Sequence, residues 1–297
     1  MNRSSVLIII SALFFGTYGI WSKLMIDDFG EFNQAWIRAL IILLILVPLG
    51  LYLQSFRKIE NSDWKWFAVI SLAGGLNQAP YFYGFAHLSI GTATLLFYLA
   101  LTIGAFIIGG LFFRERITKA KYTALVLSVI GLTIIYQFSL TANQFLAAGS
   151  TLLSGFLGAI YVVFSKNVSS KYSEVQILSV VFGTMLLVNL PISLLLGETT
   201  PSFRETTAWL GQLGYATAML LANAAVIAGF RHIEPSIGGL LGLLEVVFAA
   251  ILGILIFQET VTGSLLLGSF CILIAAGLSD MVALIKNVKE GRTITIV

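Results

Sequence analysis

Charged residues are scarce in this sequence. Asp, Glu, Lys and Arg make up 10% of the 297 residues, whereas hydrophobic residues make up 58%, and the mean hydropathy is +0.96. These proportions leave too few polar side chains to cover one globular core of this size in water. A soluble single-core protein is therefore excluded, and lipid must surround most of the chain.

Cysteine, histidine and the common catalytic motifs are also nearly absent. Cys271 is the only cysteine, which excludes an internal disulfide. The two histidines, His87 and His232, have no cysteine or acidic partner at metal-ligand spacing, so we expect no metal site and no cofactor. The phosphate-binding pattern Gly-x-x-x-x-Gly-Lys-Ser/Thr is missing, which excludes a nucleotide-driven pump within this chain. Paired-histidine and Gly-x-Ser-x-Gly motifs are missing too, and we predict that the protein is not an enzyme.

Apolar segments of about 20 residues, the length that crosses a bilayer core, account for most of the chain. They lie near residues 5–26, 34–53, 66–86, 90–112, 118–137, 146–165, 174–197, 207–230, 234–257 and 262–284. We therefore expect an all-α integral membrane protein with ten transmembrane helices. The connections between segments are short and leave no room for a soluble catalytic or nucleic-acid-binding domain.

The basic residues predict the topology of these segments. With both termini in the cytosol, 14 of the 17 Lys and Arg residues fall in inner loops and tails, whereas Arg204 is the only one in an outer loop. This is the bias expected when Lys and Arg stay inside. The sequence predicts a multi-pass protein of the inner, cytoplasmic membrane with both ends in the cytosol.

The two halves of the chain share a sequence repeat. Residues 84–118 align with residues 229–262 when one residue of slippage is allowed, and the aligned identities include His87 with His232 and Glu115 with Glu259. A chance match of apolar composition does not place His and Glu alike. We therefore divide the chain into repeats at residues 1–140 and 141–297, together one membrane domain.

Each repeat contains five segments, an odd number, so the second repeat must enter the bilayer from the opposite face. Inverted repeats of this kind place two similar halves about an axis in the membrane plane. Exchange of their conformations opens a central site to each side in turn, which is the alternating-access architecture of a carrier.

These features resemble the drug/metabolite transporter superfamily, in particular its EamA-type members. The run from Phe15 to Lys23 is similar to that family's glycine-containing first helix ending in Lys, Arg38 to its Arg early in the second helix, and Glu245 and Glu259 to its ninth helix. The resemblance covers residues 5 to about 285. It implies a ten-helix carrier of a small organic metabolite, with amino acids or related compounds favoured and export favoured over import.

Glu245 is the acidic residue that stands out. It lies about ten residues into its segment, roughly at mid-bilayer given a helical rise of 1.5 Å per residue. A charged group at that depth costs about 2.5–3.5 kcal/mol on insertion scales, so a cavity-facing or proton-binding role is the leading hypothesis. The alternative is a neutral, hydrogen-bonded structural residue between helices.

Other polar and aromatic residues are candidates for the substrate site, each with a structural alternative. Asn77 and Gln78 in the third segment match Asn223 in the eighth, and their amides suit a polar solute or simply join helices. Arg38 meets an anionic group or anchors its helix at the interface. Trp21, Tyr81 and Tyr98 line a pocket for an apolar or aromatic solute or pack between helices.

We therefore expect a secondary active transporter that moves a small organic metabolite by alternating access, with proton coupling through Glu245. A flippase for a lipid-linked small molecule is the alternative, because the same fold admits amphiphiles between helices. The expected partners are the small-molecule substrate and the lipid bilayer, with no nucleic acid, and the chain acts as a monomer or a homodimer.

Overall fold

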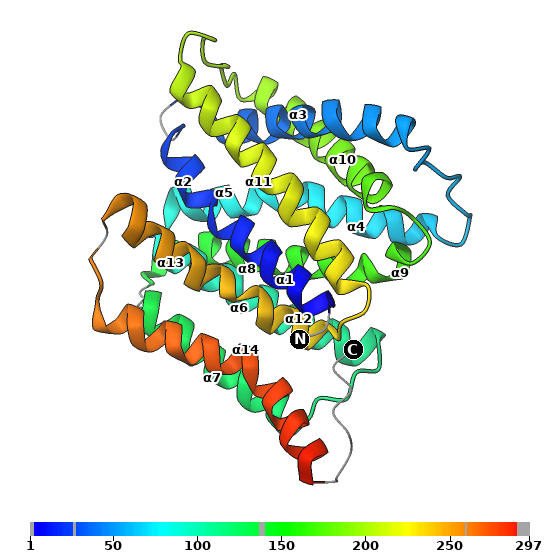
Figure 1. Ribbon diagram of the computed structural model, residues 1–297. Helices are drawn as coiled ribbons and strands as arrows, with labels where there is room; N and C mark the ends of the chain where they lie inside the picture. Colours follow the sequence, from blue (N-terminus) through cyan, green and yellow to red (C-terminus); the bar gives the residue numbers. More distant parts are fainter. Residues whose placement is uncertain (1–2, 26–27, 137–139, 259, 290–297) are drawn as a thin grey trace.

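The structure, a computed structural model, describes residues 3–25, 28–136, 140–258 and 260–289 (Figure 1). Regular structure in these ranges is entirely helical, which confirms the expected all-α class. The elements are α1 (Arg3–Gly16), α2 (Tyr18–Lys23), α3 (Glu31–Tyr52), α4 (Trp64–Leu76), α5 (Gln78–His87), α6 (Ile90–Phe112), α7 (Lys119–Tyr136), η1 (Ala142–Gln144), α8 (Phe145–Phe164), α9 (Lys166–Ser169), α10 (Glu174–Leu195), α11 (Thr206–Phe230), α12 (Pro235–Gly242), α13 (Leu244–Phe257) and α14 (Gly263–Lys289).

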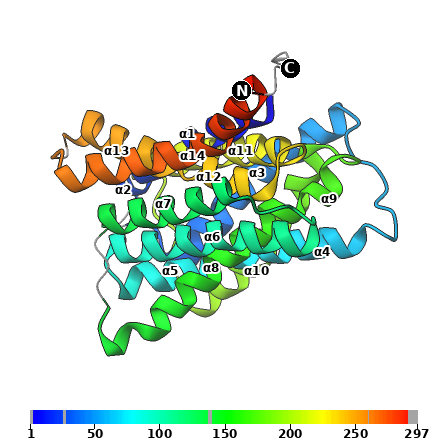
Figure 2. The ribbon, with the colours of Figure 1, turned by 90° about the horizontal axis from the view of Figure 1, so that it is seen from below.

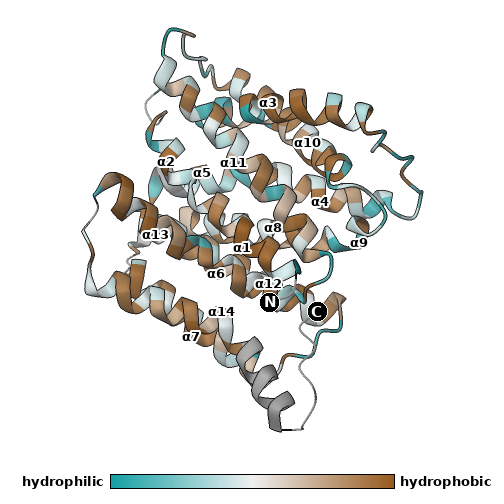
Figure 3. Ribbon diagram, in the orientation of Figure 1, coloured by the Kyte–Doolittle hydropathy of each residue, from teal (hydrophilic) through white to brown (hydrophobic). Residues whose placement is uncertain are grey.

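Eight helical segments of the described ranges are long and apolar enough to cross a membrane. Within them the backbone groups bond to one another, as a bilayer requires. The segment expected at 66–86 is divided at Asn77 into α4 and α5, and the last segment contributes a shorter apolar stretch, Gly263–Leu278. A multi-pass membrane protein is therefore confirmed, while the number of ten spans stays a prediction. Figure 3 shows hydrophobic residues along the helices and hydrophilic residues gathered in the loops at either end.

Helix ends repeat between the two halves. In the described ranges, four residues have a left-handed backbone: Gln54 after α3, Gly197 after α10, Arg114 after α6 and Gln258 after α13. The second helix of each half thus ends in the same way as its counterpart, and so does the fourth. Pro48 and Pro191 also lie inside the matching helices α3 and α10.

Helix packing repeats as well: each contact below either joins equivalent helices or has a counterpart in which the two halves are exchanged. The pairs α7 with α14 and α3 with α10 each join equivalent helices. The packing of α6 on α8 is matched by that of α12 and α13 on α1, and the packing of α4 and α5 on α8 by that of α1 and α2 on α11. Figure 1 shows the α7–α14 pair at one edge of the bundle, away from the α3–α10 pair.

Glycines allow the central helices to approach closely. Gly16 on α1 lies against Phe248 and the Glu245 carbonyl on α13, and Gly155 on α8 lies against the Phe97 carbonyl on α6. A side chain at either glycine has no room, because its Cβ would meet backbone atoms of the neighbouring helix. Small residues at such contacts are typical of helices packed within membranes.

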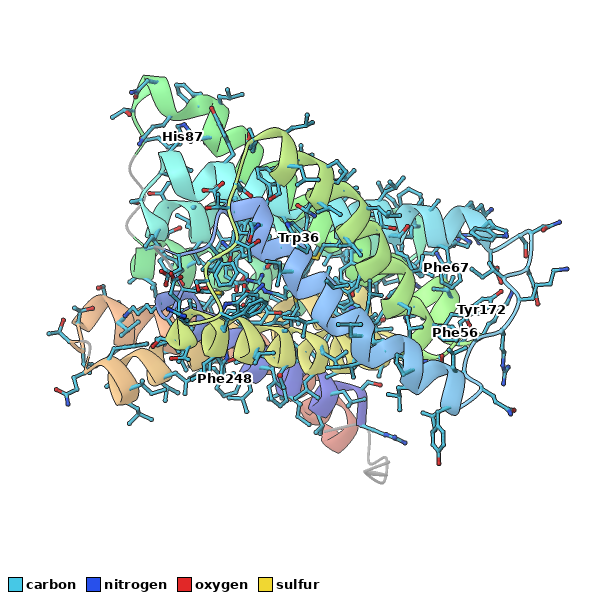
Figure 4. All side chains as sticks on the ribbon, turned by 90° about the horizontal axis from the view of Figure 1, so that it is seen from above. Trp36, Phe56, Phe67, His87, Tyr172 and Phe248 are labelled. Carbon is cyan, nitrogen blue, oxygen red and sulfur yellow. The ribbon has the colours of Figure 1, made fainter. Side chains whose placement is uncertain are left out.

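The loops gather at two ends of opposite charge. We call the loops 53–63, 113–118, 170–173 and 231–234 the basic end, where Lys171 bonds to Asp63 and Lys166 to the Ile233 carbonyl. We call residues 24–25 and 28–30 and the loops 88–89 and 196–205 the acidic end, where the Glu198 carboxylate accepts from the Asn33 N–H at 2.6 Å. Figure 4 shows Phe56, Phe67 and Tyr172 together at the basic end and His87 at the other.

Candidate functional site

A central cavity lies between the two halves of the bundle. Its empty volume is about 1150 Å³, which includes the open space at its mouth. The first, third, fourth, sixth, eighth and ninth segments of the sequence all contribute to its wall, as does α10. Most of the lining is apolar or aromatic, with a few polar groups that converge on the space, as is usual for small-molecule sites.

Glu245 is the only Asp, Glu, Lys, Arg or His on the cavity wall among the described residues. It lies in the first turn of α13, directly after the interruption at Leu243 that separates α12 from α13. A helix N-terminus favours negative charge, so this position offers the carboxyl group local support inside the bilayer. Tyr98 lines the cavity with it, and Tyr18, Tyr81, Tyr98 and Tyr215 all lie within its electrostatic range.

The interruption at Asn77 supplies the amides of the cavity. Pro80 has no N–H to continue the helix hydrogen bonds, which accounts for the break between α4 and α5. The Ser154 hydroxyl on α8 donates to the Asn77 carbonyl oxygen at 2.7 Å, and the Gln78 side chain donates to Asn77 Oδ1 at 3.1 Å. Asn77 and Gln78 both line the cavity, close to Tyr81 in the next turn.

Asn223 lies on the part of the cavity wall that α11 contributes. Its Oδ1 accepts a 2.8 Å hydrogen bond from the Tyr161 hydroxyl, and its Nδ2 donates to the Met219 carbonyl oxygen. The structure therefore brings the amides of both halves to one cavity, and their role in substrate binding stays a prediction.

Arg38 and Trp21, the two remaining candidates, do not line the cavity. The Arg38 residue is 1% exposed, so it does not snorkel to the interface. Its guanidinium group lies 3.5 Å from the centre of the Tyr215 ring and donates to Gln34 Oε1 at 2.9 Å. Trp21 packs against Gly214 on α11 and donates to Thr17 Oγ1 at 3.1 Å.

Sequence reasoning missed three tyrosines of the cavity wall, Tyr18, Tyr161 and Tyr215. The rings of Tyr18 and Tyr215 lie 4.1 Å apart, and the Arg38 guanidinium group packs on the Tyr215 ring. Their positions in apolar helices distinguish them little from packing aromatics. Tyr18 had one usable signal, since it lies within the glycine-containing run that resembles the first helix of the family.

Comparison with known proteins agrees with this architecture. The sequence profile of the EamA-like transporter family matches twice, over residues 2–137 and 145–279. The chain is similar to the pseudopaline exporter CntI of Pseudomonas aeruginosa (strain UCBPP-PA14), with 26% identity over 210 residues, which is 69% of this chain and 72% of the exporter.

Two further similarities extend the comparison. A "probable amino-acid metabolite efflux pump" of Salmonella typhimurium (strain LT2) is 26% identical over 193 residues, which is 61% of this chain and 62% of that protein. One solved crystal structure superposes with a TM-score of 0.80 over 95% of this chain and 99% of its own, at 14% identity, a likeness that shows the fold alone.

Proposed function

Because the chain belongs to the EamA-like transporter family, we propose that it is a secondary active transporter which exports a small organic metabolite across the inner membrane by alternating access. An amino acid or a related compound is the proposed substrate class, which the name of the similar Salmonella typhimurium protein supports, and the names of both similar proteins support export. The observation that carries this proposal is the central cavity with its single carboxyl group, Glu245.

The proposed architecture is ten spans in two inverted repeats, at residues 1–140 and 141–297. The paired left-handed helix ends, the matched prolines and the exchange of helix contacts all support it. Inversion follows from five spans in each half. The basic end is then cytosolic, in keeping with the retention of Lys and Arg inside.

The proposed state of the carrier is open toward the acidic end. At the basic end α12 packs on α6, whereas in the described residues α13 has no comparable packing on α6 (Figures 1 and 2). If the two repeats are exchanged, the α12–α6 contact at the basic end corresponds to an α13–α6 contact at the acidic end. Alternation would therefore close α13 on α6 while it separates α12 from α6.

Counterflow in proteoliposomes tests this function. Liposomes loaded with one unlabelled amino acid at a time are expected to accumulate the labelled form of a transported compound. Gly158→Trp on α8 places a large ring at the cavity wall and should abolish the exchange, whereas Gly149→Trp on the exposed side of the same helix should not. Movement of lipid-linked molecules without any soluble exchange would instead identify a flippase.

A further inference from the structure

Tyr18 holds a buried hydroxyl group that has no hydrogen-bond partner in the described part of the chain. The Tyr18 Oη atom is buried, yet no described group hydrogen-bonds to it, and the residue lines the central cavity. Buried hydroxyl groups are normally hydrogen-bonded, because an unpaired one loses its bonds to water without replacement. An unpaired donor on a cavity wall therefore points to a ligand acceptor.

Arg38 gives that position a positive potential. Its guanidinium group is buried behind Tyr215 and donates to the neutral amide oxygens of Gln34 and Gln212, while its Nε atom has no partner among the described residues. No carboxylate in the described ranges forms an ion pair with it. The charge therefore acts on its surroundings unneutralised, and Tyr18 and Tyr215 both lie within its electrostatic range.

The three side chains form one stack. The Tyr215 ring lies 3.5 Å from the Arg38 guanidinium carbon and 4.1 Å from the Tyr18 ring, with Phe15 edge-on to Tyr18 at 5.3 Å. The stack holds the Tyr18 ring in place at the cavity wall. It also keeps Arg38 itself out of the cavity, so Tyr18 and Tyr215 are the residues between that charge and a solute.

Glu245 lines the same cavity as these tyrosines. It acts electrostatically on Tyr18 and Tyr215, whereas Arg38 is separated from the cavity by the Tyr215 ring. The cavity thus has an ionisable carboxyl group, Glu245, on its wall and the positive charge of Arg38 behind Tyr215. A solute with one charge of each sign is aligned between the two.

From this arrangement we propose that Tyr18, backed by Tyr215 and Arg38, is a subsite for the carboxylate group of a zwitterionic substrate, whose ammonium group faces Glu245. This proposal rests on the proposed function and adds the orientation of the substrate. A hydroxyl donor suits a carboxylate oxygen, since hydrogen bonds to charged groups are the stronger kind.

Ligand binding to the purified protein tests the subsite separately from transport. L-phenylalanine, L-leucine and L-threonine are each compared with their own amides, which keep the ammonium group and lack the negative charge. Wild type is expected to bind at least one acid about 10- to 100-fold more tightly than its amide, the range for a hydrogen bond to a charged group. Tyr18→Phe keeps the ring and the stack and should bring that ratio close to one.

Two further variants separate this role from a general loss of packing. Tyr122→Phe, on the exposed surface of α7, should keep the wild-type ratio. Arg38→Gln removes the charge and should lower the ratio at least several-fold even if affinity for the amides is unchanged. An acid bound no more tightly than its amide in wild type, or a ratio unchanged in Tyr18→Phe, overturns the subsite. Counterflow with Tyr18 intact still decides the carrier function independently.

Discussion

The Ser154 hydroxyl donates a 2.7 Å hydrogen bond to the Asn77 carbonyl oxygen, where α4 gives way to α5. The bond joins the sixth segment to the third at Asn77, the N-cap residue of α5. Backbone carbonyl groups within a bilayer have no water to replace such a donor. The break is therefore supported from outside its own helix, which keeps Asn77 and Gln78 at the cavity wall.

Ser154→Ala removes this donor and should lower the free energy of unfolding by about 1 kcal/mol, the scale of hydrogen bonds between membrane helices. Unfolding in mixed detergent micelles measures the change. Ser179→Ala is the matched control, because the Ser179 hydroxyl bonds to the Val175 carbonyl in its own helix. Equal effects of the two changes would contradict a special role for the bond across helices.

Lys121 is expected to be critical for stability at the basic end. Its ammonium group lies 2.6 Å from a Glu115 oxygen and 2.7 Å from a Glu234 oxygen, and the Glu115 side chain is 2% exposed. Lys121→Met leaves Glu115 buried without its counter-charge, a loss that typically costs about 3–5 kcal/mol. Thermal unfolding in detergent measures it.

Two controls test whether the charge itself matters. Lys119→Met, two residues away and exposed, should change stability little. The double change Lys121→Met with Glu115→Gln removes both charges and should recover much of the loss. A double variant as unstable as Lys121→Met would contradict this explanation and indicate lost packing instead.

Asp63 should make the stability of the protein depend on pH. The hydrogen bond from Lys171 holds the pKa of the Asp63 carboxyl below its ordinary value, against the opposing effect of burial and with help from Tyr172. A depressed pKa in the folded state stabilises the protein above the unfolded value of about 3.9, and that contribution disappears as pH falls through the folded value. Asp63→Asn should therefore melt earlier than wild type at pH 6–8, with a gap that narrows below about pH 4.

Glu60→Gln is the matched control for this pH dependence. Glu60 binds the same Lys171 ammonium at 3.3 Å, but its side chain is 65% exposed. Exposed ion pairs contribute little, so its melting temperature should stay near that of wild type across the pH range. A gap for Asp63→Asn that does not change with pH would show that the carboxyl group acts only through shape and hydrogen bonding.

The topology prediction concerns Asn143, an exposed residue before α8. A cysteine at this position in a Cys271→Ser background should react with an impermeant thiol reagent added outside intact cells. A cysteine at Lys58, in the basic end, should react only after the cells are opened. The reverse pattern would contradict the cytosolic placement of the basic end, and labelling of both from one side would contradict the inversion of the repeats.

The sequence was sufficient to predict the all-α membrane class and the repeat, because apolar length and the matched His87 and His232 do not depend on tertiary contacts. It also predicted one shared site for Asn77, Gln78, Asn223 and Glu245, since buried polar groups in membrane helices are costly and tend to face cavities. The sequence could not predict that Arg38 lies behind Tyr215. That relation depends on the rotation of two helices from different halves, which no local pattern encodes.

The breaks within the helices could be predicted from the sequence only in part. Pro80 gives a local reason for the break at Asn77. The break at Leu243 has no proline, and only the glycines Gly238, Gly239 and Gly242 before it weaken the helix. Its consequence is that Glu245 lies at a helix N-terminus rather than within a helix, which changes the electrostatic setting of the one carboxyl group on the cavity wall.

That setting leads to the prediction for Glu245. Replacement by Gln keeps the size of the side chain and its capacity to hydrogen-bond, but removes its ability to bind and release a proton. If Glu245 couples transport to protons, Glu245→Gln should insert normally, still exchange substrate in counterflow, and no longer respond to a pH gradient across the liposome membrane. Glu205→Gln, exposed at the acidic end, should respond like wild type. Full stimulation by the gradient in Glu245→Gln would assign the carboxyl group a structural role, because a group that cannot titrate cannot carry the proton.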